Sequence, residues 1–266
     1  MGAKNGKIGD ALAFLLPDTG SVYVEPFGGS FGVGKRLGTR YPVRIYNDLE
    51  PCALAVMRQL TSLQAEDFYM QAIQEIQYSP EYLKKCIERF ACETDPVQKG
   101  IYAWAILTLS YSGNGKCHKF ATTSEAKKRY YRSMETRRKV LAMLRNVQVT
   151  EQDAMDCIRS HDVEGTVIYA DPPYVLEKQQ DNKLYHKSWD MQVQRQFLDT
   201  VCAVRHAAVL ISGYDNELYN SRLKGWWRCD VGEVSKAIAA AKHGGKKPRA
   251  HEIVWANYSI AGGEKL

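Results

Sequence analysis

Apolar and polar positions along the chain predict an α/β region at each end and a helical region between them. In the first region, apolar runs at 22–24 and 43–48 have the pattern of strands, and apolar residues at 8–16 and 51–60 recur at helical spacing. In the last region the sequence predicts a helix at 189–206 and strands at 147–149, 166–170, 207–213, 228–234 and 252–258. Strands that alternate with helices are typical of the α/β class.

The middle of the chain has a helical pattern throughout. Its apolar residues predict helices at 68–76, 82–90 and 97–109, and a basic helix at 127–144. Tyr102 and Trp104 lie in the most apolar of these helices, so we interpret them as core residues rather than as groups that stack on bases. The chain is therefore interpreted as one α/β domain, residues 1–62 and 146–266, interrupted by a helical domain over residues 63–145.

The clearest motif follows the predicted strand at 166–170 and reads Asp171-Pro172-Pro173-Tyr174. Proline cannot donate to a sheet ladder and fixes its own φ, so the strand must end at Asp171. This holds an acid on a stiff turn at the carboxyl end of a strand, which is where open α/β sheets bind ligands. The alternative is a plain turn that ends a strand.

A glycine-rich turn joins the first strand to the segment after it, with glycines at 28, 29, 32 and 34. Bare backbone lets a ligand approach closely. Asp48 lies twenty residues beyond Gly28, which matches the acid that binds ribose hydroxyls in nucleotide sites. Sites for NAD, FAD and S-adenosyl-L-methionine (SAM) all share this arrangement, but the spacing is not GxGxxG, which counts against a dinucleotide. Turn glycines beside a capping acid remain the alternative.

Composition narrows the class of protein. The 266 residues are 45% hydrophobic and 25% charged, as in ordinary soluble globular chains. No apolar run approaches the length of a membrane span, and the start of the chain has too little apolar length for a signal peptide. The seven cysteines form no CxxC pair, which disfavours a disulfide framework or a zinc cluster. We therefore expect a cytoplasmic protein with no membrane partner and no metal.

Positive charge is gathered in two patches. From 116 to 145 the chain has ten Lys or Arg against two Glu, a local net charge of +8 that exceeds the +6 of the whole chain. A second patch at 242–249 has four Lys or Arg and no acid. Such patches are expected of a surface that meets a polyanion, with a solvated helix face as the alternative.

The glycine turn followed by Asp-Pro-Pro-Tyr resembles the Dam-like, alpha-group DNA adenine-N6 methyltransferases. The resemblance covers most of both α/β regions and is poor in the middle, where that family keeps its target-recognition region. It implies a Rossmann-like, SAM-dependent methyltransferase sheet with an inserted helical target-recognition domain. The cofactor would be SAM and the partner double-stranded DNA, without an obligate protein partner, in a monomer or weak dimer from a prokaryote or phage.

The resemblance also implies roles for single residues. The catalytic residues would be Asp171, Pro172 and Tyr174. The residues implied to contact SAM are Lys4, Glu25, Pro26, Phe27, Gly28, Gly29, Asp48, Asp153 and Asp171. The basic residues that we predict to contact DNA are Lys116, Lys119, Lys127, Lys128, Arg129, Arg132, Arg137, Arg138 and Lys139, followed by a second candidate set of Lys246, Lys247 and Arg249.

One residue departs from the family pattern. Phe31 stands two positions after Gly29, where the family often has glycine or another small residue. Either Gly32 and Gly34 provide the close approach, or the Phe31 ring points away from the cofactor.

These residues suit methyl transfer to an amino group. The lone pair of the adenine amino group is delocalised into the ring, so the group is a poor nucleophile. The Asp171 carboxylate and the Pro172 carbonyl could accept its two N–H bonds and favour the pyramidal nitrogen that attacks a methyl group. A base within a duplex must first flip out, and stacking on Tyr174 would offset part of that cost.

Three other functions remain open at the level of sequence. The same motif serves N4-cytosine methyltransferases and RNA adenine methyltransferases, because any exocyclic amino group can use it. A non-catalytic SAM-binding or DNA-binding partner subunit is the alternative from another class. The recognition sequence and a link to restriction-modification are not encoded in these motifs.

Overall fold

The computed structural model describes residues 4, 6–111, 113, 119–174, 189–235 and 249–266, with side chains not described at 125, 129 and 132–138. In the part that it describes, one sheet runs through the molecule with the strand order β3-β2-β1-β4-β5-β7-β6-β8. The strands are β1 (Val22–Glu25), β2 (Val43–Asn47), β3 (Val147–Thr150), β4 (Thr166–Ala170), β5 (Ala208–Tyr214), β6 (Trp227–Ser235), β7 (Arg249–Ala256) and β8 (Glu264–Lys265).

The first five strands are parallel, and their order 3-2-1-4-5 is that of the dinucleotide-binding fold. β7 lies antiparallel between β5 and β6. In the centre, Val24 pairs with Ile45 and with Ile168, and Ile168 pairs with Val209. These apolar, β-branched residues are buried, as is usual where helices cover both faces of a parallel sheet. The prediction of a Rossmann-like α/β sheet is confirmed.

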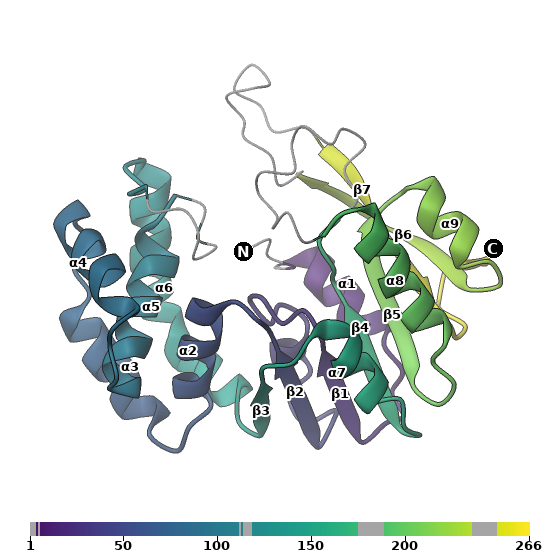
Figure 1. Ribbon diagram of the computed structural model, residues 1–266, viewed down its shortest axis with the longest axis horizontal. Helices are drawn as coiled ribbons and strands as arrows, with labels where there is room; N and C mark the ends of the chain where they lie inside the picture. Colours follow the sequence, from purple (N-terminus) through teal and green to yellow (C-terminus); the bar gives the residue numbers. More distant parts are fainter. Residues whose placement is uncertain (1–3, 5, 112, 114–118, 175–188, 236–248) are drawn as a thin grey trace.

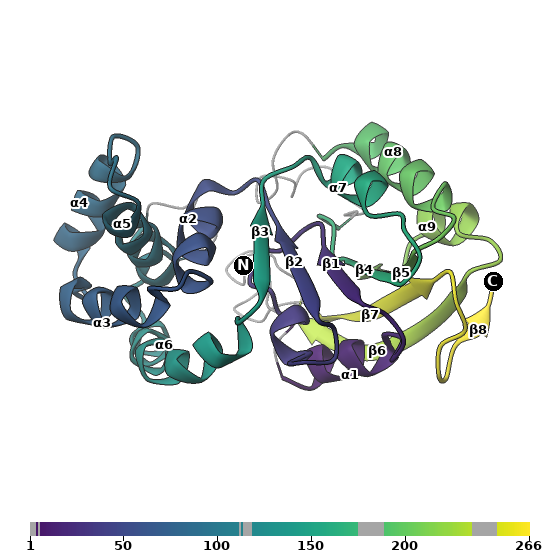
Figure 2. The same cartoon turned by 90° about the horizontal axis from the view of Figure 1, so that it is seen from below.

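Helices cover the two faces of the sheet, α1 on one face and α7 and α8 on the other (Figure 2). The helices around the sheet are α1 (Lys7–Leu15), η1 (Gly34–Arg36), α2 (Pro51–Leu60), α7 (Ala154–Ser160), α8 (Met191–Cys202) and α9 (Glu217–Arg222). Alternate residues of one strand enter different cores: Tyr23 belongs to the same core as Leu12 of α1, whereas Val24 belongs to that of Phe197 of α8.

A group of helices lies beside the β3 edge of the sheet (Figure 1). Its members are α3 (Ala65–Glu75), α4 (Pro80–Phe90), α5 (Pro96–Leu109) and α6 (Ser124–Met143). Trp104 of α5 is fully buried, with its ring centroid 5.6 Å from that of Phe68, and Tyr102 is also buried. The prediction that Tyr102 and Trp104 are core residues is confirmed. α6 is attached through Tyr130, whose hydroxyl donates to the carbonyl of Ile76 at 2.6 Å.

The structure corrects the predicted bounds of several elements. α3 and α6 begin three residues earlier than predicted, at 65 and 124. α8 is shorter than the helix expected at 189–206. Asp190 caps its first turn by accepting from the amide of Gln192 at 2.8 Å. Beyond its last turn, Asp162 Oδ1 accepts from the amides of His206 (2.8 Å) and Ala207 (3.0 Å) and holds that segment out of the helix. β7 begins at 249 instead of 252, because its pairing with β6 continues to the end of that strand.

None of the helices in the described part combines the length and apolarity that a bilayer crossing demands.

Candidate active site

The turn after β4 places Asp171 at the carboxyl edge of the sheet. All five residues of Thr166–Ala170 are buried, so the strand is anchored up to the motif. The Asp171 side chain keeps 23% of its surface exposed, while Pro172 is buried. Gln194 of α8 donates from Nε2 to the carbonyl of Pro173 at 2.5 Å and fixes the direction of the turn. The motif therefore presents one partly exposed carboxylate on a braced turn.

Tyr174 is held by residues from both ends of the chain. Its hydroxyl donates to Oε1 of Glu252 on β7 at 2.6 Å, and Lys4 Nζ donates to the same hydroxyl and to Glu252. Lys4 Nζ also lies 3.6 Å from Asp171 Oδ1 and 4.8 Å from the centroid of the Tyr174 ring. The Tyr174 ring meets that of Tyr214 edge-on at 4.5 Å between centroids. Lys4, predicted as a SAM contact, thus lies beside the predicted catalytic carboxylate.

Buried polar groups continue beneath the carboxylate. Ser212 of β5 donates to Asp171 Oδ1 at 3.3 Å, and its hydroxyl lies 2.8 Å from the Tyr169 hydroxyl. Burial, followed by the charge of Asp171, raises the pKa of Tyr174 well above its usual value. Burial and the nearby Asp171 also raise the pKa of Glu252, and the ammonium of Lys4 opposes that shift.

Ser212, Gln194 and Glu252 were not predicted from the sequence. Ser212 interrupts an otherwise apolar strand, and Glu252 is a charged residue one position before an apolar run. Polar residues in buried strands were the signal that could have identified both.

The glycine turn after β1 packs against the end of β2. The amide of Gly28 donates to the carbonyl of Asn47 at 2.7 Å, and the amide of Gly29 donates to Asp48 Oδ2 at 2.7 Å. A Cβ on Gly28 would lie 2.3 Å from the ring of Tyr46, and Gly29 has φ +47°. Glycine is therefore required here for both packing and backbone conformation.

Phe31 points into the protein. It is fully buried with φ 51°, and its ring meets that of Tyr46 at 5.6 Å between centroids. A Cβ on Gly34 would lie 2.3 Å from the Phe31 ring, so Gly34 makes room for this aromatic residue. The Phe31 ring is therefore packed in the core rather than exposed at the glycine turn.

Glu25 supports the turn from inside the fold. It is 2% exposed, and its Oε1 accepts from the Tyr23 hydroxyl and from the amide of Gly34, each at 2.6 Å. Burial raises the pKa of Glu25 to about 8, although both hydrogen bonds oppose the shift.

The other predicted cofactor residues lie along the same edge. Asp48 is half-buried, and its Oδ1 accepts from the amides of Leu49 and Glu50, just before α2, at 2.8 and 2.9 Å. Asp153 is exposed, caps α7 and accepts from the amide of Met155 at 2.9 Å. Pro26 is buried, and Phe27 is half-buried with its ring centroid 5.2 Å from that of Trp189. Because β1 to β4 are parallel, these residues share the edge with Asp171.

The predicted DNA contacts fall on α6 and just before it. Four of them are exposed: Lys119, Lys127, Lys128 and Lys139. Lys116, Lys246 and Lys247 lie outside the described residues, as do the side chains of Arg129, Arg132, Arg137 and Arg138. Arg249 is described and pairs with Glu233 at 2.8 Å.

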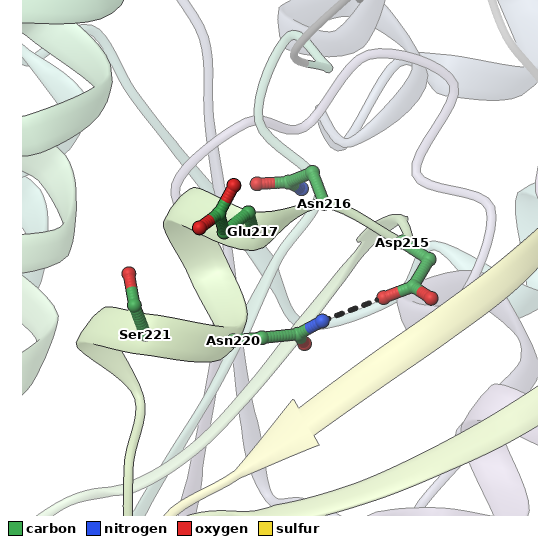
Figure 3. A pocket seen from close by; sticks show the side chains of 5 residues that line it. All are labelled: Asp215, Asn216, Glu217, Asn220 and Ser221. Carbon is green, nitrogen blue, oxygen red and sulfur yellow. Dashed lines mark hydrogen bonds between the residues drawn. The ribbon is translucent and has the colours of Figure 1, made fainter.

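An open hollow at the start of α9 has different lining residues (Figure 3). They are Asp215, Asn216, Glu217, Asn220 and Ser221. Asn220 Nδ2 donates to Asp215 Oδ1 at 2.8 Å, and Arg228 pairs with the same carboxylate at 3.0 Å. None of the predicted site residues lines this hollow.

Comparison with known proteins identifies the class to which this arrangement belongs. Residues 3–234 match the family model described as D12 class N6 adenine-specific DNA methyltransferase. The chain belongs to this family. As a member it is an enzyme that methylates adenine N6 in DNA, so the predictions of the family, of the reaction and of DNA as substrate are confirmed.

The other comparisons add little to this assignment. A search of curated protein sequences found no significant match. Among solved structures, the chain is similar to the rRNA methyltransferase aviRa from Streptomyces viridochromogenes, with 15% sequence identity and a TM-score of 0.40, over 94% of this chain and 81% of that one. At that TM-score the likeness is limited.

Proposed function

We propose that this DNA adenine methyltransferase takes its methyl group from SAM and transfers it to an adenine flipped out of double-stranded DNA, with Asp171 as the group that holds the adenine amino nitrogen. The observation that carries the proposal is the common edge of the sheet, on which the glycine turn, Asp48 and Asp171 stand at the ends of neighbouring strands. Methyl transfer needs a site for the methyl donor next to a group that accepts hydrogen bonds from the adenine amino group.

The residues at the glycine turn fit SAM. Gly28 is packed so closely that a Cβ would meet the Tyr46 ring, and Gly29 has positive φ, so the turn offers bare backbone. Asp48 and Asp153 offer carboxylates for hydroxyl and amino groups, and Phe27 offers an apolar surface. Glu25 and Pro26 act by shaping the turn. When bound, SAM supplies an electrophilic methyl group on a sulfonium.

Asp171 and Pro172 act on the adenine amino group. The carboxylate and the Pro172 carbonyl each accept a hydrogen bond from one N–H of the amino group. This favours a pyramidal nitrogen, whose lone pair is no longer delocalised into the ring. Asp171 then stabilises the positive charge that develops on this nitrogen, so the catalysis is positioning and electrostatics. The braced turn keeps both acceptors fixed.

Tyr174 receives the flipped base. Flipping removes the base from its stack and pair, and stacking on an aromatic ring returns about 1–3 kcal/mol. The Tyr174 ring is fixed for this role by its hydroxyl contacts and by the edge of Tyr214.

DNA binding is proposed for the helical insertion over 63–145, with α6 and its exposed lysines as the phosphate-contacting surface. This helix group lies beside the β3 edge of the sheet, and the segment from 116 to 145 concentrates the positive charge of the chain (Figure 1). We further propose that the enzyme acts in the cytoplasm as a monomer or weak dimer.

The test of Asp171 compares methylation with SAM binding. Asp171→Ala should reduce methyl transfer by at least about 100-fold, because the variant has no carboxylate to accept the amino N–H. SAM binding, measured by isothermal titration calorimetry, should stay within a few-fold of the native enzyme. Methyl transfer that survives Asp171→Ala would refute the catalytic assignment.

A further inference from the structure

Glu252 is a buried carboxylate next to the catalytic one. It stands opposite Tyr214 in the register of β5 and β7, and none of its surface is exposed. Its Oε1 accepts from Lys4 and from Tyr174, whereas its Oε2 is buried without a hydrogen-bond partner among the described residues. A buried acid with one unsatisfied oxygen is costly to the fold, so its presence calls for a functional reason.

Lys4 is shared between two carboxylates. Its ammonium bonds to Glu252 and lies 3.6 Å from Asp171 Oδ1, with 12% of the side chain exposed. An ammonium that moved fully onto Asp171 would occupy the lone pairs that the adenine amino group must use. A second acid is therefore needed to hold Lys4 aside.

We propose that Glu252 is a positioning residue that draws the Lys4 ammonium and the Tyr174 hydroxyl away from Asp171, so that the catalytic carboxylate stays free to accept the adenine amino group. The inference rests on the proposed role of Asp171. Glu252 is fully buried, so it acts through Lys4 and Tyr174 and does not touch the substrate.

Neutralising Glu252 changes which carboxylate the Lys4 ammonium pairs with. The amide of Glu252→Gln carries no charge. Among the described residues, Asp171 is then the remaining carboxylate within ion-pair distance of Lys4. The methyl-transfer rate should then fall about 100-fold, the size of effect that a small misplacement in an active site causes. The KM for DNA should change little, because the exposed lysines of α6 are untouched.

A double variant separates this role from a structural one. At saturating SAM, Lys4→Met combined with Glu252→Gln should be faster than Glu252→Gln, because the ammonium that blocks Asp171 is gone. Glu252→Asp keeps the charge and should retain more activity than Glu252→Gln, which keeps the test decisive if the amide variant folds poorly. Glu264→Gln removes an exposed glutamate that pairs with Arg228 and should behave as the native enzyme.

The measurement is the single-turnover rate of N6-methyladenine formation, together with the melting temperature of each variant. A double variant no faster than Glu252→Gln, or a Glu252→Gln rate equal to that of Glu264→Gln, would overturn the role of Glu252. A native enzyme that forms no N6-methyladenine would instead refute the proposed function, so the two failures are distinguishable.

Discussion

Two buried glutamates lie on either side of the β4 strand that carries Asp171. Glu25 ends β1 under the glycine turn, and Glu252 lies on β7 beside Tyr174. Burial is the main cause that raises the pKa of both, and the charge of Asp171 adds to it. A raised pKa favours the neutral form of a buried acid, so the carboxylate offered to the amino nitrogen that becomes positive during transfer is that of Asp171.

Glu25 gives a pH dependence that can be tested. Its pKa is raised from an ordinary value of 4.5 to about 8 in the folded protein. A raised folded-state pKa contributes stability that is fully present below pH 4.5 and is lost as pH rises through 8. The amide of Glu25→Gln has no acidic proton, so it does not titrate in this range. It resembles the protonated acid in charge and keeps an oxygen that can accept from Tyr23 and Gly34.

The free energy of unfolding of Glu25→Gln should therefore increase relative to the native protein between about pH 5 and about pH 8, by a few kcal/mol in order of magnitude. Urea denaturation at several pH values measures the difference. If the two proteins keep a constant difference across that range, Glu25 is not the group that titrates.

At the scale of elements, the sequence predicted what local patterns encode. The strand before Asp171 and the helix at Pro51–Leu60 were located to the residue, because the first is a buried run ended by proline and the second starts with a capping Glu50 and Pro51. The short α9 and β8 were not predicted, since six and two residues carry too little periodic pattern. The positions of Tyr174 and Lys4 relative to Glu252 depend on contacts between distant segments, which local patterns do not encode.

The proposed role of α6 in DNA binding can be tested by the salt dependence of the affinity for DNA. Each phosphate contact contributes about 0.9 to the slope of log K against log salt concentration. The double variant that carries Lys127→Gln and Lys139→Gln should have a shallower slope, by about 0.9 for each phosphate that the helix no longer binds. The matched control is Lys224→Gln with Lys265→Gln, two exposed lysines outside the helical insertion with the same change in charge. Fluorescence anisotropy on a DNA duplex measures both slopes, and equal slopes would mean that these α6 lysines form a solvated face.

At the scale of the whole molecule, the proposed methyl-transfer edge and the basic helical surface are parts of one chain. The edge is formed by the ends of parallel strands, and the helix group lies next to β3 at one side of the sheet (Figure 1). The positive charge of the segment from 116 to 145 exceeds that of the whole chain, so the rest of the molecule is slightly acidic. This separation of charge suits an enzyme that binds DNA phosphates at its basic residues and stabilises a developing positive charge elsewhere, at the Asp171 carboxylate.

The most direct test of this account is mass analysis of the nucleosides from unmethylated double-stranded DNA incubated with the protein and SAM. The account predicts N6-methyladenine with the native enzyme and its absence with Asp171→Ala. N4-methylcytosine as the product, or N6-methyladenine formed equally by Asp171→Ala, would contradict it.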